Sequence, residues 1–194
     1  MSAGLFVDGQ NLINKLHDVA VKELGQKTFD QVNFDYKKLF DSALPGYKLS
    51  KRIFYSAKIR QHQDTLKKSQ ELIQKQRRLK TVLEKTGFDF VMAGNVRGNY
   101  EVDQKSGKSV LVFREKGVDV AMAVDAVIMA CDKKLKTAIL CTSDSDLQPT
   151  VSQLKARGVE VVYLGFSMSP NKGLIFTTSK TILFRIEEIL NCIK

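Results

Sequence analysis

The chain has 194 residues, enough to bury the core of a single domain, and it carries a formal net charge of +10. It contains no run of about 18 apolar residues that could span a bilayer, and the segment Met1–Asp8 lacks the charged leader and cleavable apolar stretch of a secretion signal. We therefore expect one domain over residues 1–194, no association with a membrane, and a cytoplasmic location.

Apolar runs that alternate with helical patterns predict an α/β fold built around a parallel sheet. A short buried strand is expected at Leu5–Val7, and Gly9 opens a helix in which apolar residues recur three and four positions apart. A minor helix over Phe34–Ala43 stops at the turn signal Pro45-Gly46. The next strand is expected at Lys51–Ala57.

A long helix is predicted from Arg60 to Lys85. The apolar positions that share one of its faces are Leu66, Leu72, Ile73, Leu79, Val82 and Leu83. Its opposite face is basic, so the helix can pack on the sheet and still present positive charge to solvent. A strand is expected at Phe88–Met92, and a hairpin of Val96–Val102 and Val110–Phe113 is expected to leave the core. Residues 60–116 thus add a basic helix and hairpin to the domain.

Beyond the hairpin the pattern returns to alternating helices and strands. We predict an apolar helix at Gly117–Ala130, a strand at Thr137–Cys141, a helix at Leu147–Arg157 and a strand at Val159–Leu164. After Pro170 the pattern is weaker, and it indicates a short helix, a stretch at Thr181–Phe184 and a last helical turn over Glu187–Asn191.

The three cysteines are Cys131, Cys141 and Cys192, which are widely spaced and set in apolar surroundings. An odd number at such spacing indicates neither a disulfide framework nor a zinc knuckle. We interpret all three as reduced core residues.

The excess of positive charge lies in one part of the chain. Between Tyr47 and Lys116 there are 17 Lys and Arg residues and 7 Asp and Glu residues, whereas the rest of the chain has 14 of each. Such asymmetry is typical of a surface that binds a polyanion, because Lys and Arg that neutralise phosphates release condensed counterions. The alternative is a solvated face that only aids solubility. The candidate phosphate-binding residues are Lys67, Lys68, Arg77, Arg78 and Lys80 on the helix, and Arg97, Lys105, Arg114 and Lys116 on the hairpin.

Four aspartates stand where strands end or helices begin. They are Asp8 at the end of the first strand, Asp119 in the first turn of the apolar helix, and Asp144 and Asp146 after the strand at Thr137–Cys141. Because open α/β sheets place their ligands at the carboxyl ends of strands, we expect these carboxylates at one edge of the sheet. Two also have a purely structural explanation, since Asp146 can cap the next helix and Asp119 can complement a helix N-terminus.

Carboxylates that converge in one cleft repel one another unless a cation neutralises them. A hard divalent ion with oxygen ligands fits such a cluster best, and with no histidine or cysteine nearby Mg²⁺ or Mn²⁺ is favoured over zinc. Asp125 comes after Asp119 by about 240° around the helix, at 100° per residue. We expect it to support the site or to pair with a basic residue rather than to bind the same ion.

Three segments carry a recognisable pattern: Phe6–Leu12, Lys116–Asp125 and Thr142–Pro149. In order, spacing and flanking hydrophobicity they closely resemble the three blocks of the NYN domain family within the PIN-like nuclease superfamily. The resemblance extends from Leu5 to about Leu190, and it implies a PIN-like three-layer fold with a central, mostly parallel sheet flanked by helices. The chain departs from the family near its C-terminus, where members often have an acidic residue and this chain has Thr178-Ser179-Lys180.

The resemblance also implies hydrolysis of RNA phosphodiester bonds with Mg²⁺ or Mn²⁺, as by an endoribonuclease, and RNA binding by the basic residues. The catalytic, metal-binding set would be Asp8, Asp119, Asp144 and Asp146, with Asn11 supporting Asp8. Asp8 and Asp144 are expected to bind the metal directly, and Asp119 directly or through water. Asp146 is expected to hold a second ion or to orient the attacking water. Thr142 and Ser143 are expected to bind the phosphate or to form the turn.

Two other functions stay open. A small-molecule, metal-dependent phosphatase would have a second aspartate two residues after the first, where this chain has Gln10. A non-catalytic RNA-binding or scaffold protein with the nuclease fold would be expected to lose acidic residues, and none of the four is missing. The sequence defines neither the RNA nor the oligomeric state, so a homo-oligomer or a protein partner that supplies specificity also stays open.

Overall fold

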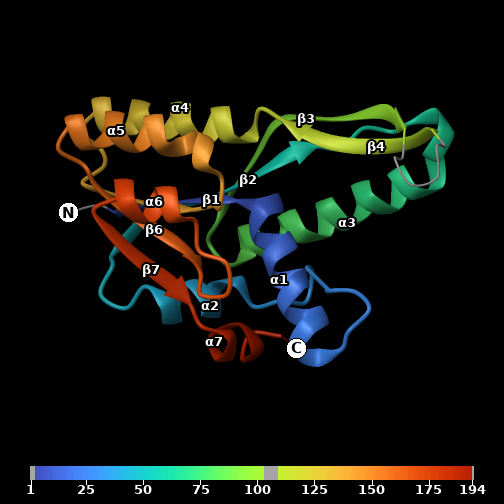
Figure 1. The fold of residues 1–194 in the computed structure, drawn as a ribbon, viewed down its shortest axis with the longest axis horizontal. Helices are drawn as coiled ribbons and strands as arrows, with labels where there is room; N and C mark the ends of the chain where they lie inside the picture. The colour runs from blue at the N-terminus through green and yellow to red at the C-terminus, as the bar shows by residue number, and fades with distance from the viewer. Residues whose placement is uncertain (1–2, 103–108, 194) are drawn as a thin grey trace.

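The computed structural model describes residues 3–102 and 109–193. The strands in these ranges are β1 (Ala3–Asp8), β2 (Leu49–Lys58), β3 (Asp89–Val102), β4 (Ser109–Lys116), β5 (Thr137–Cys141), β6 (Glu160–Phe166) and β7 (Lys180–Phe184). They form one sheet in the order β4-β3-β2-β1-β5-β6-β7 (Figure 1). All neighbouring strands are parallel except β3 and β4, which are antiparallel.

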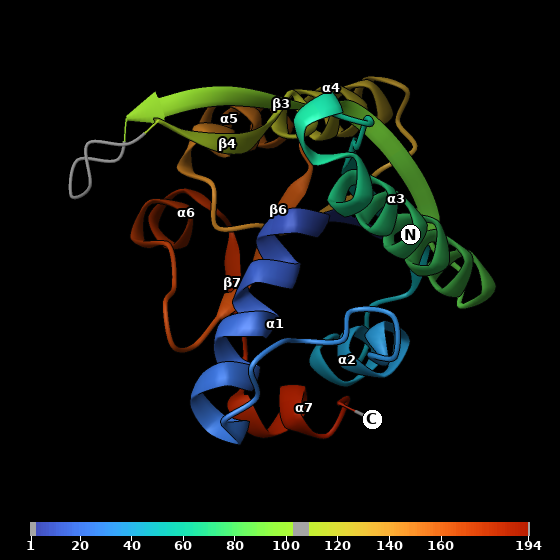
Figure 2. The ribbon, with the colours of Figure 1, turned by 90° about the vertical axis from the view of Figure 1, so that its right-hand side faces the viewer.

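Helices cover both faces of this sheet. They are α1 (Gly9–Leu24), α2 (Tyr36–Ala43), α3 (Leu66–Lys85), α4 (Val118–Cys131), α5 (Gln148–Ala156), α6 (Lys172–Thr177) and α7 (Ile186–Leu190), with 3-10 turns at Gln63–Thr65 and Ser145–Leu147. The helices α1, α2, α3 and α7 lie on one face, and α4, α5 and α6 lie on the other (Figures 1 and 2). The three-layer α/β class with a mostly parallel sheet is thus confirmed. In the described ranges, none of the helices is both long and apolar enough to cross a membrane.

Alternate side chains of the strands enter two separate cores. On β1, Leu5 and Val7 join the core on the side of α1, whereas Phe6 joins the core on the side of α4. All three side chains are fully buried. A strand that is buried on both faces is a continuous apolar run, which is why this strand is visible in the sequence.

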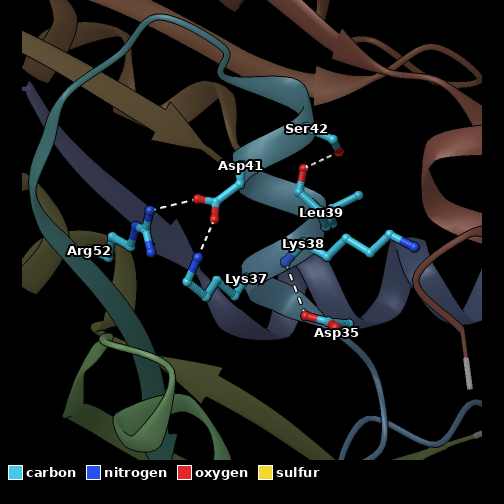
Figure 3. Close-up of polar contacts among 7 residues, drawn as sticks. All are labelled: Asp35, Lys37, Lys38, Leu39, Asp41, Ser42 and Arg52. Carbon is cyan, nitrogen blue, oxygen red and sulfur yellow. Dashed lines mark hydrogen bonds and ion pairs between the residues drawn. The ribbon is translucent and has the colours of Figure 1, made fainter.

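Polar contacts hold α2 against β2 (Figure 3). Asp35 caps the helix by accepting a hydrogen bond from the backbone N–H of Lys38 at 3.0 Å. The carboxylate of Asp41 accepts a hydrogen bond from Arg52 Nη2 of β2 at 2.6 Å, and it also pairs with Lys37 one helical turn earlier. The helix begins later than predicted, because Asp35 takes the capping position.

The two strands predicted at Phe88–Met92 and Val96–Val102 are one strand, β3. Its inner half pairs with β2, and from Asn95 outward it pairs with β4. Gly94 joins the halves with a φ of +70°, and a Cβ there would lie 2.0 Å from the carbonyl oxygen of Lys116. Only glycine accepts both that φ and that approach, so the strand passes through an irregular pairing without ending.

Helix α3 begins at Leu66 rather than at Arg60. Of its predicted apolar face, Leu79 and Leu83 are buried. Leu66 and Leu72 are 50% and 40% exposed, so the prediction of a continuous buried face is wrong for the first half of the helix. The second half packs on the sheet, whereas the first half lies beside the β3–β4 hairpin (Figure 1).

Two of the three cysteines are buried as predicted, Cys141 in β5 and Cys192 after α7. Cys131 is exposed, so its assignment to the core is wrong. The buried face of α4 includes Ala126 and Ala130, and Cys131 is about 100° further around the helix than Ala130. Its sulfur accepts a hydrogen bond from Arg157 Nε at 3.2 Å.

Candidate functional site

Two of the predicted aspartates, Asp8 and Asp144, meet where the strand order of the sheet reverses. From β1 the chain adds β2 and β3 on one side, and β5, β6 and β7 follow on the other. Val7 of β1 pairs with Cys141 of β5, so the residues that follow these two strands emerge side by side. Those residues include Asp8 and the loop that carries Asp144. This is the switch point at which open α/β sheets bind their ligands.

Asp8 is fixed by the turn from β1 into α1. Its carboxylate caps α1 by accepting a hydrogen bond from the backbone N–H of Asn11 at 3.0 Å. The hydroxyl of Thr142 donates a longer hydrogen bond to the second oxygen, at 3.5 Å. A Cβ on Gly9 would lie 2.2 Å from a ring carbon of Phe54, so only glycine lets α1 start this close to β2.

The loop after β5 is held by its own side chains. Thr142 is 2% exposed, and its hydroxyl accepts a hydrogen bond from the backbone N–H of Asp144 at 3.1 Å. The carboxylate of Asp144 in turn accepts a hydrogen bond from the backbone N–H of Asp146 at 2.9 Å and caps the 3-10 turn. The loop therefore presents Asp144 in a defined position next to Asp8.

Two asparagines clamp the middle of this loop. Asn11 Oδ1 accepts a hydrogen bond from the backbone N–H of Ser143 at 3.1 Å. Asn171 Nδ2 donates to the carbonyl oxygen of Ser143 at 2.8 Å. The backbone N–H of Asn171 donates to the hydroxyl of Tyr163 on β6 at 3.0 Å. Sequence reasoning missed Asn171 and Tyr163, whose only local signal is the ability of Asn171 to cap α6.

A cavity of about 230 Å³ lies at the switch point. Its lining brings together three of the four predicted aspartates and one further acid: Asp8, Asp119, Asp144 and Glu115. Asp119 reaches it from the first turn of α4, which begins after Gly117 with a φ of +88°. The sequence blocks that contain these aspartates are thus neighbours in space.

Glu115, at the end of β4, was not predicted. Burial, and then the negative charge of Asp8, raise the pKa of Glu115 to about 7, although a hydrogen bond with the backbone of Ala57 lowers it in part. Glu115 directly precedes the Lys116–Asp125 block, and an acidic residue at the end of an apolar strand was the same signal that identified Asp8.

Asp8 also has a perturbed carboxyl group. Burial raises the pKa of Asp8 above its ordinary value, and the charges of Asp144 and Asp119 raise it further. The hydrogen bonds from Asn11 and Thr142 act in the opposite direction. Closely placed carboxylates in a partly buried cavity therefore favour a proton or a cation.

Asp146, the fourth of these aspartates, and Asp125 lie outside the cavity lining. Asp146 is exposed at the end of the loop and is not part of the cavity lining. Asp125 accepts a hydrogen bond from the hydroxyl of Tyr55 at 3.0 Å. Burial, and then the charge of Asp125, raise the pKa of Tyr55. Asp125 thus supports the packing of α4 on β2 through a tyrosine rather than through a basic residue.

The predicted basic residues that the structure describes line two different cavities or lie outside them. Lys68 and Arg114 line a larger cavity beside the acidic one, whereas Arg78 lines a separate pocket on the other side of α3. Lys80 pairs with Glu84 at 3.7 Å. The remaining positions are Lys67 and Arg77, exposed on α3, and Lys116, exposed at the end of β4. Lys105 and the side chain of Arg97 lie outside the described residues.

The acidic side chains of the cavity are candidate ligands for a divalent ion. Among residues 3–102 and 109–193, no three His, Cys, Asp or Glu side chains already converge as a ligand shell. The cavity nevertheless offers only oxygen donors from the acidic residues, which suits a hard cation. Mg²⁺ usually keeps several water molecules and uses one or two carboxylates, so a pair such as Asp8 and Asp144 fits its chemistry.

The molecule is a three-layer α/β protein with acidic side chains at the switch point of its sheet. The chain belongs to the NYN domain family, whose model matches residues 2–183, and this confirms the resemblance of the three sequence blocks. The fold is similar to the crystal structure of a protein of unknown function from Vibrio parahaemolyticus, with a TM-score of 0.59. The two sequences are 19% identical, and the match covers 95% of this chain and 93% of that chain. At this identity the likeness shows the fold alone. No curated protein matches the chain.

Proposed function

We propose that this protein is a metal-dependent ribonuclease that hydrolyses RNA phosphodiester bonds. The observation that carries the proposal is the cavity in which Asp8, Asp119 and Asp144 meet at the switch point. Membership in the NYN family supports the nuclease class. The excess of positive charge between Tyr47 and Lys116 supports a polyanionic substrate.

Asp8 and Asp144 would hold Mg²⁺ or Mn²⁺, and Asp119 would bind it directly or through water. When bound, such an ion lowers the pKa of a water molecule and offsets charge on the leaving oxygen. The chain itself positions the carboxylates. Asn11 donates to Asp8 and accepts from Ser143, so it holds both loops at a fixed separation.

Three further predicted residues take different roles. Asp146, at the exposed end of the loop, remains the candidate for a second ion or for orienting the attacking water. The hydroxyl of Thr142 is buried and already bonded to Asp8 and Asp144, so we assign it to holding the loop rather than to the scissile phosphate. Ser143 has the same structural role, because its N–H and carbonyl are both bonded within the fold.

We add Glu115 as a proton-transfer group. Its carboxyl lines the acidic cavity, and a pKa of about 7 allows it to give or take a proton near neutral pH. A cation that neutralises Asp8 lowers the pKa of Glu115, which leaves the carboxylate available as a base.

The phosphatase alternative is disfavoured at one position. The residue two places after Asp8 is Gln10, which lines the cavity but carries no carboxylate that could act as an acid or base. The non-catalytic RNA-binding alternative is decided by assay.

Cleavage of a fluorescent single-stranded oligoribonucleotide, followed with Mg²⁺ and with excess chelator, tests the proposal. Cleavage is expected only with the metal and only while Asp8 and Asp144 are present. The matched control is Asp18→Asn, an exposed aspartate of α1 far along the helix from Asp8. Wild-type cleavage by both Asp8→Asn and Asp144→Asn would defeat the assignment. Tight RNA binding by a protein that cuts no RNA would establish the non-catalytic alternative.

A further inference from the structure

A larger cavity, of about 580 Å³, adjoins the acidic one. It lies between the first half of α3, the start of α1 and the β3–β4 hairpin. Gln10, Asn14 and Glu115 line both cavities, so a ligand in one can reach the other. Its volume falls in the range of about 300–1,000 Å³ that is usual for pockets that bind small organic ligands.

The wall of this larger cavity is apolar and aromatic. The rings of His62 and Phe113 meet edge to face, with their centroids 5.6 Å apart. Phe113 on β4 is 37% exposed and Leu72 on α3 is 40% exposed, although both line a concave surface. An exposed aromatic ring in a cavity is a platform on which a planar base can stack.

The charge of the lining suits a phosphate chain. Arg60, Lys68 and Arg114 line the cavity. Apart from Glu115 at the junction, the described residues of the lining include no acid. The side-chain amides of Gln10 and Asn14 add donors and acceptors that can meet the polar edges of a base. Rings, amides and cations are thus combined beside the carboxylates.

The second pocket beside α3 lacks this combination. Its lining includes Lys75 and Arg78, but also Asp30 and Glu71. The hydrogen bond from the Val32 N–H lowers the pKa of Asp30 most, and hydrogen bonds from Asn33 and the nearby charge of Lys75 lower it further. That pocket therefore places acidic side chains among its basic ones, whereas Glu115 is the one acid among the described residues that line the larger cavity.

We propose that the larger cavity binds one unpaired nucleotide of single-stranded RNA, adjacent to the phosphate that lies over the acidic cavity. This inference rests on the proposed function, which puts the phosphate that is cut at the acidic cavity. It adds that the RNA substrate is single-stranded. A base inside a duplex is stacked and paired, so it cannot enter the cavity, whereas an unstacked base can lie against Phe113. Lys68 and Arg60 then contact the flanking phosphates.

The absence of tryptophan from the chain allows a direct test. The Phe113→Trp variant carries a single indole in the cavity, and the control Phe176→Trp carries one on α6 at a position that is 90% exposed. Both are made in the Asp144→Asn background with Mg²⁺ present, so that the RNA stays intact. Single-stranded oligoribonucleotide should quench Phe113→Trp emission to saturation and leave the control unchanged. The same sequence as a duplex should bind on the order of tenfold more weakly.

Affinity measurements separate the ring from the charge. Phe113→Ala should weaken single-strand binding on the order of tenfold, and Phe113→Tyr should restore it. If Phe113→Ala does not fold, Phe113→Leu keeps the apolar volume without the ring. Lys68→Ser should reduce the log-log salt slope of binding by about 0.7, whereas Lys85→Ser, at the other end of the same helix, should not.

The outcomes distinguish this inference from the proposed function. If RNA quenches the fluorescence of Phe113→Trp to saturation but the protein with Asp144 intact cuts no RNA, the nucleotide-binding cavity is supported and the nuclease assignment is overturned. If the protein cleaves RNA with metal, but fluorescence is not quenched and the Phe113 variants bind RNA with wild-type affinity, nucleotide binding in the larger cavity is overturned and the nuclease assignment is supported. Equal quenching by strand and duplex overturns the single-stranded assignment.

Discussion

Asn11 Oδ1 accepts a hydrogen bond from the backbone N–H of Ser143, 132 positions away in the chain, at 3.1 Å. The backbone N–H of Asn11 at the same time donates to Asp8. One residue therefore sets the spacing between the two strand ends that carry the proposed metal ligands.

Asn11→Ala removes the acceptor for Ser143 and should loosen the loop of Asp144. Because partners that orient ligands typically change metal affinity by about 10–100-fold, we expect Mg²⁺ binding to weaken by a similar factor. The loss of stability should be smaller, about 0.5–1.5 kcal/mol for one hydrogen bond. Calorimetric titration with Mg²⁺ and chemical denaturation measure the two effects. Asn33→Ala, in an exposed loop, is the control. An unchanged Mg²⁺ affinity in Asn11→Ala would show that Asn11 does not position the proposed metal ligands.

Asp8→Asn should abolish cleavage and yet stabilise the metal-free protein. An amide cannot supply the anionic ligand, but it can still cap α1 as well as a carboxylate does. The raised pKa of Asp8 means that its charge is unfavourable in the fold, so removing the charge should raise the melting temperature near pH 7. Thermal melts in chelator check this. A lower melting temperature than wild type would show that the carboxylate cluster is not repulsive.

Glu115 should make the metal-free protein less stable as pH rises. Its pKa is about 7 in the fold against an ordinary 4.5, so between these values the native state holds a proton that the unfolded chain has lost. The stabilisation is complete below pH 4.5 and disappears as pH passes about 7, with a slope of at most about 1.4 kcal/mol per pH unit. Denaturation of dialysed protein between these pH values should show a flatter profile for Glu115→Gln than for wild type. Glu23→Gln, an exposed change on α1, should keep the wild-type slope.

Divalent metal should act on stability as well as on activity. Mg²⁺ or Mn²⁺ at about 100 times the dissociation constant should add about 2.7 kcal/mol to the free energy of unfolding. For a chain of this size, each kcal/mol raises the melting temperature by roughly 2–4 °C. Chelator should remove both this shift and cleavage, and Zn²⁺ should restore cleavage poorly because the acidic donors are all oxygen. Full activity in excess chelator would be incompatible with the metal mechanism, and Asp8→Asn should show little metal-induced shift.

The parts of the site that the sequence predicts are those with a local signal. Asp8 ends a short apolar run and is followed by a glycine, and Asp144 follows a second such run. Because parallel strands bring their carboxyl ends to one edge of the sheet, the proximity of Asp8 and Asp144 can be predicted even when the loop conformations are unknown. The alternation of buried runs and helical patterns likewise predicts the three layers.

The parts that the sequence does not predict depend on contacts between distant segments. The clamp of Asn171 on Ser143 joins two loops, and neither loop has a pattern that reveals the other. A helical period shows which residues of α3 share a face, but not that Leu72 borders an open cavity instead of the core. Glu115 reaches the acidic cavity because Gly94 allows β3 to continue into the hairpin, and this is a property of backbone approach rather than of composition.

The same glycine makes the hairpin a separable part of the molecule. Among the residues that the structure describes, the outer half of β3 pairs only with β4, so its length beyond Asn95 is not constrained by the parallel strands of the central sheet. Exchanging the outer hairpin for that of a relative, while keeping Gly94, Glu115 and Lys116, would transplant the wall that carries Phe113 and leave the carboxylates where they are. The hairpin is therefore the part of the fold in which the proposed nucleotide-binding wall can be exchanged without moving the acidic side chains.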